Sequence, residues 1–349
     1  MKIAIVDTYY PDFIAANPLQ GGTYEQELRR ILERRFGTHT GYSSALRGLG
    51  HEVVDIIANH IELNRLWMTE NLPRIRAADI DIPSIIWEES LDPDLLFLQD
   101  LSFYTADLLE HYSKDYSLAG QLSCRFDNYE SLKQFDVLFT SFPFYVERFE
   151  KLGVKGVFLP LAFDPIVIER ANVPIARTHA VSFVGGYGRH WNMDPLFTKL
   201  AEETPIQFWG YGFENSPKCV RSKWLGPSWG MDMYDIYMRS HIVLNRHGGI
   251  SQGLSNNLRM FEAAGCGALL LTENSPNIGD YFAPGECAVY DSPQDAVNKI
   301  HHFLSRPDEI LRIASNGQQR TLSKHTYAQR MPIVARELQS CLDRKSVTA

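Results

Sequence analysis

Two short apolar runs, separated by a polar glycine loop and a helical segment, constrain the fold of this chain most strongly. The runs are residues 242–244 and 268–271, and neither alternates with polar residues. Such continuous runs are typical of parallel strands that helices cover on both faces. The order strand, loop, helix, strand therefore predicts an α/β fold with a parallel sheet.

Polar residues gather directly after the first of these runs. They are Asn245, Arg246, His247, Gly248 and Gly249. Open α/β sheets bind ligands in the crevice outside the carboxyl ends of their strands. We therefore expect the loop to belong to a ligand site, with Arg246 and His247 contacting the ligand. The alternative for His247 is a ring that only orders the glycine loop.

The segment after the loop has the pattern of a helix with a polar start. Ser255 is the expected N-cap ahead of Asn256 and Asn257, and the amide hydrogens of such a first turn attract an anion such as a phosphate. Arg259 and Glu262 then share one helix face, because residues three apart are neighbours there. They are either ligand contacts or an ordinary surface ion pair.

A second glycine-rich turn follows the apolar residues 180–184. It contains Gly185, Gly186 and Arg189. Glycines let a pyrophosphate approach the backbone closely, and an arginine can neutralise its charge. Tyr211, in the next glycine turn, is available to stack on a base or sugar ring, and structural packing is the equal alternative.

The run NNLRMFEAAGCGALLLTE, with GDYFAPGECAVYDSPQDA and HTYAQRM after it, resembles the C-terminal half of GT-B glycosyltransferases. The resemblance is to the bacterial group related to the spore-maturation protein CgeB, and it spans most of residues 181–331. It implies that Glu262 binds the ribose hydroxyls of a nucleotide-sugar. Many retaining members carry a second glutamate at the position of Leu254. The resemblance therefore leaves the stereochemical outcome open.

The fold implied by this resemblance is α/β, with two Rossmann-like domains facing each other across a cleft. A length of 349 residues with 44% hydrophobic content is enough for two cores. We expect an acceptor-side domain over 1–168, a nucleotide-sugar-binding domain over 178–325, and a terminal helix over 326–349 that crosses back to the first domain. Expected strands in the first half are 4–6, 53–57, 95–98, 137–140 and 157–159, with helices over 24–36 and 41–49.

Carboxylates at strand ends in the first half are candidates for proton transfer. An acceptor hydroxyl loses its proton during glycosyl transfer, and a positioned side chain can take it if the reaction inverts configuration. Asp100 is the first choice as catalytic residue, since it follows a very apolar strand. The alternative is a carboxylate that caps the following segment. Asp7 is a weaker candidate, and His247 is a second catalytic candidate on the donor side.

Composition and charge limit the partners. A net charge of −8 argues against a general nucleic-acid binder, and the five cysteines show no paired metal spacing. The resemblance implies that the departing diphosphate is held by Arg189, Arg246, Arg259 and the turn at Asn256, without a cation. We therefore predict no metal and no cofactor, with the nucleotide-sugar as substrate.

The cell compartment is predicted from the absence of targeting signals. The chain opens in a strand without a secretion signal and has no apolar run long enough to span a bilayer, which predicts a cytoplasmic protein. The arginine-rich segment over 28–36 offers peripheral contact with anionic lipid. The favoured alternative is a solvated helix face.

We predict transfer of a sugar from a nucleotide-sugar donor to a glycan, lipid-linked or small-molecule acceptor. One alternative is a sugar-nucleotide epimerase of the same fold. A second is a non-catalytic nucleotide-sugar-binding protein, which the residue at Leu254 keeps open. A dinucleotide-dependent oxidoreductase is disfavoured, because DTYYPDF follows the first strand in place of a glycine fingerprint.

Overall fold

The computed structural model describes residues 1–75, 91–170, 175–188 and 194–348. The chain divides into two compact units, one formed by Met1–Pro160 with Tyr327–Ala349 and the other by Leu161–Thr326. The first unit thus ends at Pro160, ahead of the expected boundary at 168, and the last segment of the chain belongs to it. Each unit has its own parallel sheet covered by helices, which is the architecture of two Rossmann-like domains.

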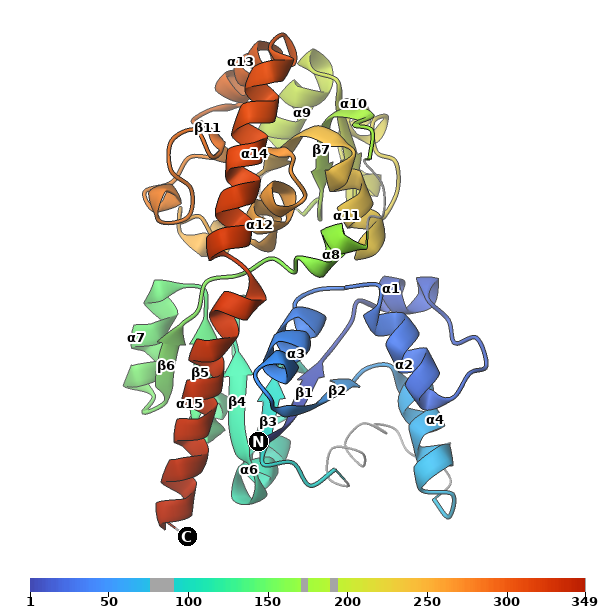
Figure 1. Ribbon diagram of the computed structural model, residues 1–349, viewed down its shortest axis with the longest axis vertical. Helices are drawn as coiled ribbons and strands as arrows, with labels where there is room; N and C mark the ends of the chain where they lie inside the picture. The colour runs from blue at the N-terminus through green and yellow to red at the C-terminus, as the bar shows by residue number, and fades with distance from the viewer. Residues whose placement is uncertain (76–90, 171–174, 189–193, 349) are drawn as a thin grey trace. The chain divides into compact units, whose positions relative to one another are not determined.

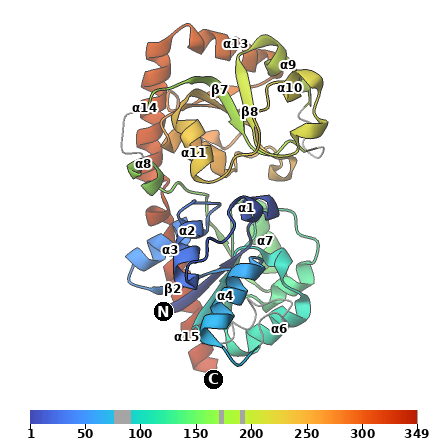
Figure 2. The ribbon, with the colours of Figure 1, turned by 90° about the vertical axis from the view of Figure 1, so that its right-hand side faces the viewer.

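The first unit contains, among its described residues, a parallel sheet of six strands in the order β2-β1-β3-β4-β5-β6 (Figure 1). The strands are β1 (Lys2–Asp7), β2 (Glu52–Ile57), β3 (Leu95–Leu98), β4 (Ser117–Gln121), β5 (Val137–Thr140) and β6 (Lys155–Phe158). The helices are α1 (Pro11–Ala16), α2 (Tyr24–Leu32), α3 (His39–Gly48), α4 (Ile61–Asn71), α6 (Ala106–Asp115), α7 (Pro143–Lys151) and α15 (Tyr327–Thr348). Figures 1 and 2 together show α3 and α15 on one face of this sheet and α6 and α7 on the other.

The strand β4 lies outside the predicted set, although its five residues are all buried. Its sequence, SLAGQ, has no run of large apolar side chains. The reason is space: a Cβ added to Gly120 would lie 2.9 Å from side-chain atoms of Leu101 and of Phe135. This central strand therefore needs a small residue where the pattern of a buried strand predicts a large one.

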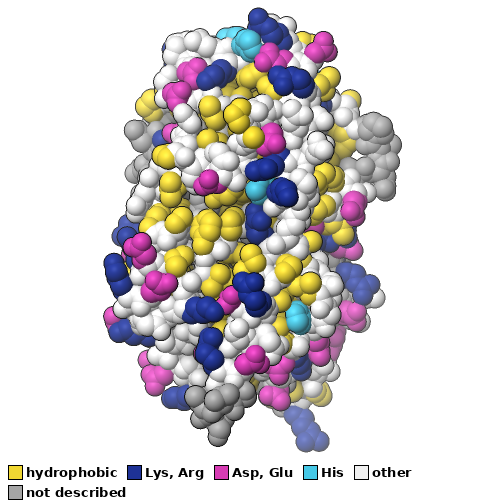
Figure 3. All heavy atoms as spheres, turned by 60° about the vertical axis from the view of Figure 1, so that its left-hand side comes forward, with side chains coloured by type: hydrophobic (Ala, Val, Ile, Leu, Met, Phe, Trp, Pro, Cys, Tyr) yellow, Lys and Arg dark blue, Asp and Glu magenta, His cyan; other side chains and the backbone are white. Residues whose placement is uncertain are grey.

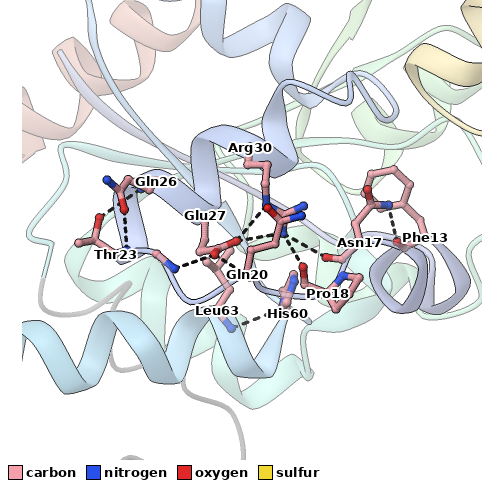
Figure 4. Close-up of polar contacts among 11 residues, drawn as sticks. Phe13, Asn17, Pro18, Gln20, Thr23, Gln26, Glu27, Arg30, His60 and Leu63 are labelled. Atoms are coloured by element: carbon pink, nitrogen blue, oxygen red, sulfur yellow. Dashed lines mark hydrogen bonds and ion pairs between the residues drawn. The ribbon is translucent and has the colours of Figure 1, made fainter.

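The connection between α1 and α2 is held by one buried carboxylate (Figure 4). Glu27 is only 2% exposed, and its Oε1 accepts the backbone N–H groups of Gln20 at 2.7 Å and Gly22 at 3.0 Å. Its Oε2 pairs with Arg30 at 2.9 Å. The side chain of Thr23 caps α2. These contacts fix the glycine loop that precedes the helix.

The arginine-rich segment is helical only as far as Leu32, where α2 ends ahead of the predicted end at 36, and this helix packs its apolar side inward. Ile31 is buried, and Arg29 pairs with Glu25 at 2.9 Å on the exposed side. Side chains of both charges occur across the face of the molecule shown in Figure 3. None of the helices in the described part of the chain combines the length and apolar composition that crossing a bilayer requires.

The second unit contains a parallel sheet that has, within its described residues, five strands in the order β11-β10-β9-β7-β8. The strands are β7 (His179–Val184), β8 (Ile206–Trp209), β9 (Ser240–Asn245), β10 (Leu269–Glu273) and β11 (Ala288–Tyr290). The helices are α8 (Ile166–Glu169), α9 (Asp194–Glu203), α10 (Lys218–Arg221), α11 (Met231–Met238), α12 (Leu258–Gly265), α13 (Pro293–Leu304) and α14 (Pro307–Lys324). The predicted order of strand, loop, helix and strand from 242 to 271 is confirmed.

Two apolar clusters cover the two faces of this second sheet. On β9, Ile242 and Leu244 pack into one cluster with residues of α9 and α13, while Val243 packs into the other with residues of α11 and α12. Alternate side chains of a strand point to opposite faces, so an unbroken apolar run fits a strand buried on both sides.

In both sheets the order of strands reverses beside the first strand. The chain adds β2 on one side of β1 and then β3 on the other, and it adds β8 and then β9 around β7 in the same manner. Such topological switch points create a crevice at the carboxyl ends of the two central strands. The fold therefore supplies one crevice after β1 and β3 and another after β7 and β9.

Candidate functional site

The crevice after β7 and β9 is bridged by one arginine. Arg259 of α12 donates from Nε to the carbonyl oxygen of Val184 at 2.7 Å and from Nη1 to Oδ1 of Asn245 at 3.1 Å. A side-chain hydrogen bond also joins it to Tyr237, and its guanidinium carbon lies 4.4 Å from the centroid of the Phe183 ring. A guanidinium group has more N–H donors than these contacts use. A cationic donor is therefore fixed at the ends of both strands.

Arg246 brings a second cation to the same place. Its Nη1 is buried and has no hydrogen-bond partner among the described residues. The positive charges of Arg246 and Arg259 both act to lower the pKa of Tyr290, although burial raises that pKa overall. Two guanidinium groups with N–H donors to spare at one crevice have the chemistry that suits an anionic ligand.

The start of α12 differs from the prediction. The helix begins at Leu258, and its N-cap is Asn257, whose Oδ1 accepts the N–H of Met260 at 3.4 Å. Ser255 is not the cap, because its hydroxyl lies 2.5 Å from that of Ser275. The Asn257 side chain also donates to the carbonyl oxygen of Arg246 at 2.8 Å. The cap therefore ties the helix to the loop that carries this arginine.

His247 lies inside the loop network. It is 7% exposed, and its Nδ1 accepts the N–H of Asn256 at 3.4 Å. Its Nε2 lies 3.1 Å from the hydroxyl of Ser255 and 3.3 Å from that of Thr272. Burial lowers the pKa of His247 to about 4, so the ring is neutral at pH 7. These contacts support the ordering role, and they occupy the Asn256 amide that we expected to be free for an anion.

The glycine turns pack against each other and against neighbouring side chains. A Cβ on Gly186 would come within 2.6 Å of the Tyr211 ring, and one on Gly185 would clash with the Arg259 guanidinium. Tyr211 is 40% exposed, and its carbonyl oxygen accepts the N–H of Tyr187 at 2.8 Å. The turn thus needs glycine for the approach of protein groups, whereas the sequence pattern predicted the approach of a pyrophosphate. Arg189 lies outside the described residues.

Glu262 is buried rather than paired at the surface. It is 6% exposed, and its Oε1 accepts the hydroxyl of Tyr234 at 3.1 Å across the packing of α11 and α12. Burial raises the pKa of Glu262 to about 7, and the Tyr234 hydrogen bond and the Arg259 charge partly oppose this. The alternative of a surface ion pair with Arg259 is therefore wrong, since Glu262 is buried and each side chain has a different partner. The ribose-binding role stays a prediction.

In the first unit, Asp100 caps a short helix. Its Oδ1 accepts the N–H of Ser102 at 3.0 Å, at the start of a 3-10 helix (Leu101–Phe103). Its Oδ2 accepts the hydroxyl of Thr8 at 2.5 Å. This is the capping arrangement that we weighed as the alternative to catalysis. Asp7, at the end of β1, lies beside it.

Several buried polar groups of the second unit have no signal in the local sequence pattern. Tyr234 precedes its partner Glu262 by 28 residues, and no local pattern indicates such a contact. The hydroxyl of Ser228 and the Nε1 of Trp229 are buried without a hydrogen-bond partner in the described part of the chain. Within that same part, no group of three or more His, Cys, Asp or Glu side chains is arranged to hold a metal ion.

Comparisons with known proteins show what the fold and the second unit are similar to. Residues 189–336 match a family model described as glycosyl transferase-like. Among solved structures, sucrose-phosphate synthase from Thermosynechococcus elongatus is 12% identical and has a TM-score of 0.59, over 97% of this chain and 100% of that chain. Anabaena HepE in complex with UDP-glucose is 13% identical with a TM-score of 0.60, over 97% and 100%. A glycosyltransferase from Rickettsia africae is 11% identical with a TM-score of 0.57, over 98% and 99%.

The comparison with curated proteins found no match. The structural likeness extends over both units and shows the fold, and the family match covers most of the second unit, where the two arginines lie. The relation to the group of CgeB stays a prediction. The chain therefore has the two-domain GT-B fold of these solved structures, and its residues 189–336 match the glycosyl transferase-like family.

Proposed function

We propose that the chain transfers a sugar from a nucleotide-sugar whose diphosphate binds Arg246 and Arg259. The observation that carries this proposal is the pair of guanidinium groups at the β7–β9 switch point, one with a buried Nη1 that no described residue uses and one held in place by the strand ends. A diphosphate presents oxygens to which an arginine can donate two hydrogen bonds at once.

The chemistry explains why cations are needed there. Cleavage of the bond between the anomeric carbon and the diphosphate leaves negative charge on the departing oxygens, and the sugar gains oxocarbenium character. Arg259 is held by its contacts to Val184, Asn245 and Phe183, so its charge is already in place before the reaction. Fixed donors of this kind stabilise charge without reorganising. We therefore propose that no metal ion is required.

The nucleoside part is assigned to Glu262, as the family resemblance implies. A carboxylate binds ribose by accepting its two hydroxyl groups, which requires the ionised form. The hydroxyl of Tyr234 holds one oxygen of Glu262, at 3.1 Å. On this proposal, donor binding favours the ionised state of Glu262, whose pKa is about 7. The similar HepE structure contains UDP-glucose, so UDP-sugars are the first donors to test.

The acceptor is a hydroxyl compound, and we assign it to the first unit. A glycan, a lipid-linked glycan and a small molecule all present such a hydroxyl. The cysteines Cys124, Cys219, Cys266, Cys287 and Cys341 are free thiols in the structure. Free thiols suit a reducing compartment, and we place the reaction in the cytoplasm.

Calorimetry on the full chain tests this function. UDP-glucose, and then GDP-, dTDP- and CMP-sugars, are titrated with and without EDTA. At least one donor is expected to bind, with the same affinity in EDTA. Absence of binding by every donor would refute the proposal, and loss of binding in EDTA would refute the metal-independent part. Product analysis without an acceptor separates transfer from epimerisation, which would alter the sugar in that condition.

A further inference from the structure

In the described part of the second unit, four buried side-chain atoms lack a hydrogen-bond partner. They are the hydroxyl oxygens of Ser228 and Ser251, Nε1 of Trp229 and Nη1 of Arg246. Arg246 and Ser251 lie in the loop after β9, and Ser228 and Trp229 lie directly before α11. Buried polar groups are normally paired, so unpaired atoms that gather on two loops indicate a polar ligand. The proposed diphosphate contacts use Arg246 and leave Ser228 and Trp229 without a role.

The loop over residues 227–230 lies at the same edge of the sheet as the two arginines. The segment that precedes it runs parallel to β8, with the N–H of Leu225 donating to the carbonyl oxygen of Phe208 at 2.9 Å. At the end of β8, the N–H of Gly210 donates to the carbonyl oxygen of Gly226 at 2.9 Å. The loop therefore follows the carboxyl end of β8, and α11 (Met231–Met238) returns from there toward the start of β9.

Along α11, contacts to the two groups assigned to the donor follow one another in order. Tyr237 makes a side-chain hydrogen bond with Arg259, which is assigned to the diphosphate. One helical turn earlier, the hydroxyl of Tyr234 donates to Glu262 at 3.1 Å, and Glu262 is assigned to the ribose. The helix begins directly after the loop over 227–230. Because diphosphate, ribose and base are joined in that order in a nucleotide, the base is expected beside this loop.

The two side chains of this loop differ in what they can recognise. Ser228 is 8% exposed, and its hydroxyl can donate or accept a hydrogen bond, whereas the indole Nε1–H of Trp229 can only donate. The edge of a base that lies farthest from the ribose carries a carbonyl oxygen in uracil, thymine and guanine, and an amino group in cytosine and adenine. An amino group facing the indole would leave two donors opposite each other, each without an acceptor.

We propose that Trp229 selects the base of the donor, with its Nε1–H donating to the carbonyl oxygen of a uracil, thymine or guanine. The hydroxyl of Ser228 pairs with the adjacent ring nitrogen, whichever role that nitrogen requires. The inference rests on the proposed function for the ribose and diphosphate contacts, and it adds the class of nucleotide. Donors with cytosine or adenine are rejected, because their amino group leaves the buried indole N–H without an acceptor.

Calorimetry with free nucleotides tests this selection. The full chain is titrated with UDP, dTDP, GDP, CDP and ADP, and at least one of the first three is expected to bind more than about tenfold more tightly than CDP and ADP. Trp229→Phe removes the N–H and keeps an aromatic ring. It is expected to weaken binding of the preferred nucleotide about 5- to 100-fold and to leave CDP almost unchanged, so that the selectivity falls. Ser228→Ala is expected to weaken both.

The matched control is Trp224→Phe, because Nε1 of Trp224 already donates to the carbonyl oxygen of Gly210 at 2.9 Å. Any loss of affinity in this variant is expected to be equal for all five nucleotides. Equal binding of all five by the wild type, or unchanged selectivity in Trp229→Phe, overturns the proposal. A chain that binds nucleotides selectively but accepts no nucleotide-sugar refutes the function and leaves the selection intact. Absence of binding by every nucleotide overturns both.

Indole NMR tests the hydrogen bond itself. Protein labelled at the tryptophan nitrogens is expected to give six indole N–H signals, one for each tryptophan of the chain, and Trp229→Phe identifies its own by the loss of that signal. Saturation with the preferred nucleotide is expected to move the Trp229 signal downfield, because its proton gains an acceptor. The Trp224 signal is expected to move little, since its proton already has one. A Trp229 signal that stays in place in the saturated complex overturns the proposal.

Discussion

The crevices of the two units have the same topology and opposite chemistry. In the first unit the strand ends carry the carboxylates Asp7 and Asp100. In the second unit the corresponding edge carries Arg246 and the incoming Arg259. Both lie where the strand order reverses. The fold therefore gives both units a crevice at the same edge of the sheet, and the few residues after each strand determine whether that edge carries carboxylates or guanidinium groups.

The crevices share one feature in spite of their opposite charges. Each has a carboxyl whose pKa is raised by burial, Asp7 to about 6 and Glu262 to about 7. In the second unit the raised group lies between helices, beside Tyr234, whereas in the first it ends a strand. In both crevices, therefore, burial disfavours the charged form of a carboxyl group, and only the position of that carboxyl in the fold differs. Variants that replace one charged side chain at a time show what each crevice contributes to stability and to donor binding.

The largest expected effect concerns stability and Glu262. Its folded pKa of about 7 lies above the ordinary value of 4.5, so its stabilising effect is complete below pH 4.5 and is lost as the pH rises through 7. A shift of this size corresponds to about 3 kcal/mol. Glu262→Gln removes the titration and keeps an acceptor for Tyr234. Urea unfolding at pH 4.5 and pH 8 is expected to show the wild type losing about that much relative to the variant. Parallel pH profiles would contradict the burial of Glu262.

The next largest effect is a loss of donor affinity, which distinguishes an arginine of the cationic crevice from an ordinary surface arginine. Arg246→Ala is expected to weaken UDP-glucose binding about 10- to 100-fold, because a charge-assisted hydrogen bond contributes about 1.5 to 3 kcal/mol. The matched control is Arg239→Ala, which removes an arginine of the same unit that pairs with Asp235 at 2.7 Å. Calorimetry measures both variants. An equal loss in both would mean that general charge, and not the crevice, attracts the donor.

The strands and the arginine-bearing loop could be predicted from sequence, because each depends on a local pattern. The apolar runs at 242–244 and 268–271 predicted β9 and β10. The strand β11 (Ala288–Tyr290) was missed because three residues are too few for a pattern.

The parts that sequence could not provide depend on distant partners. Serine is a residue type that commonly caps helices, but the hydroxyl of Ser255 is hydrogen-bonded to that of Ser275, 20 residues away. Asn257 is therefore the N-cap, and the helix begins after it. The local sequence around Glu262 is that of a surface carboxylate, but Tyr234 of the neighbouring helix hydrogen-bonds to it and covers it. Propensity is a local quantity, and tertiary contacts override it where buried polar groups compete for partners.

Donor binding is expected to depend on pH through the same glutamate. Ribose hydroxyls require the ionised carboxyl, and the pKa of Glu262 is about 7 in the structure. Affinity for UDP-glucose is therefore expected to rise about tenfold from pH 6 to pH 8, since the ionised fraction rises by that factor. The diphosphate diester of this donor does not titrate in that range. Calorimetry on Glu262→Gln should give a weaker and flat profile, and a flat wild-type profile would remove the ribose assignment.

The smallest effect compares one helix cap from each unit. Asn257 caps α12 and Thr105 caps α6, where its hydroxyl accepts the N–H of Leu108 at 3.2 Å. Replacing either by alanine is expected to lower the free energy of unfolding by about 1 kcal/mol. Only Asn257 also donates to the carbonyl oxygen of Arg246, at 2.8 Å. Asn257→Ala should therefore weaken UDP-glucose binding as well, less than Arg246→Ala does, while Thr105→Ala should not. If both caps left donor affinity unchanged, the position of Arg246 would not depend on the helix start, and the cationic crevice would be organised by Asn245 and Arg259 alone.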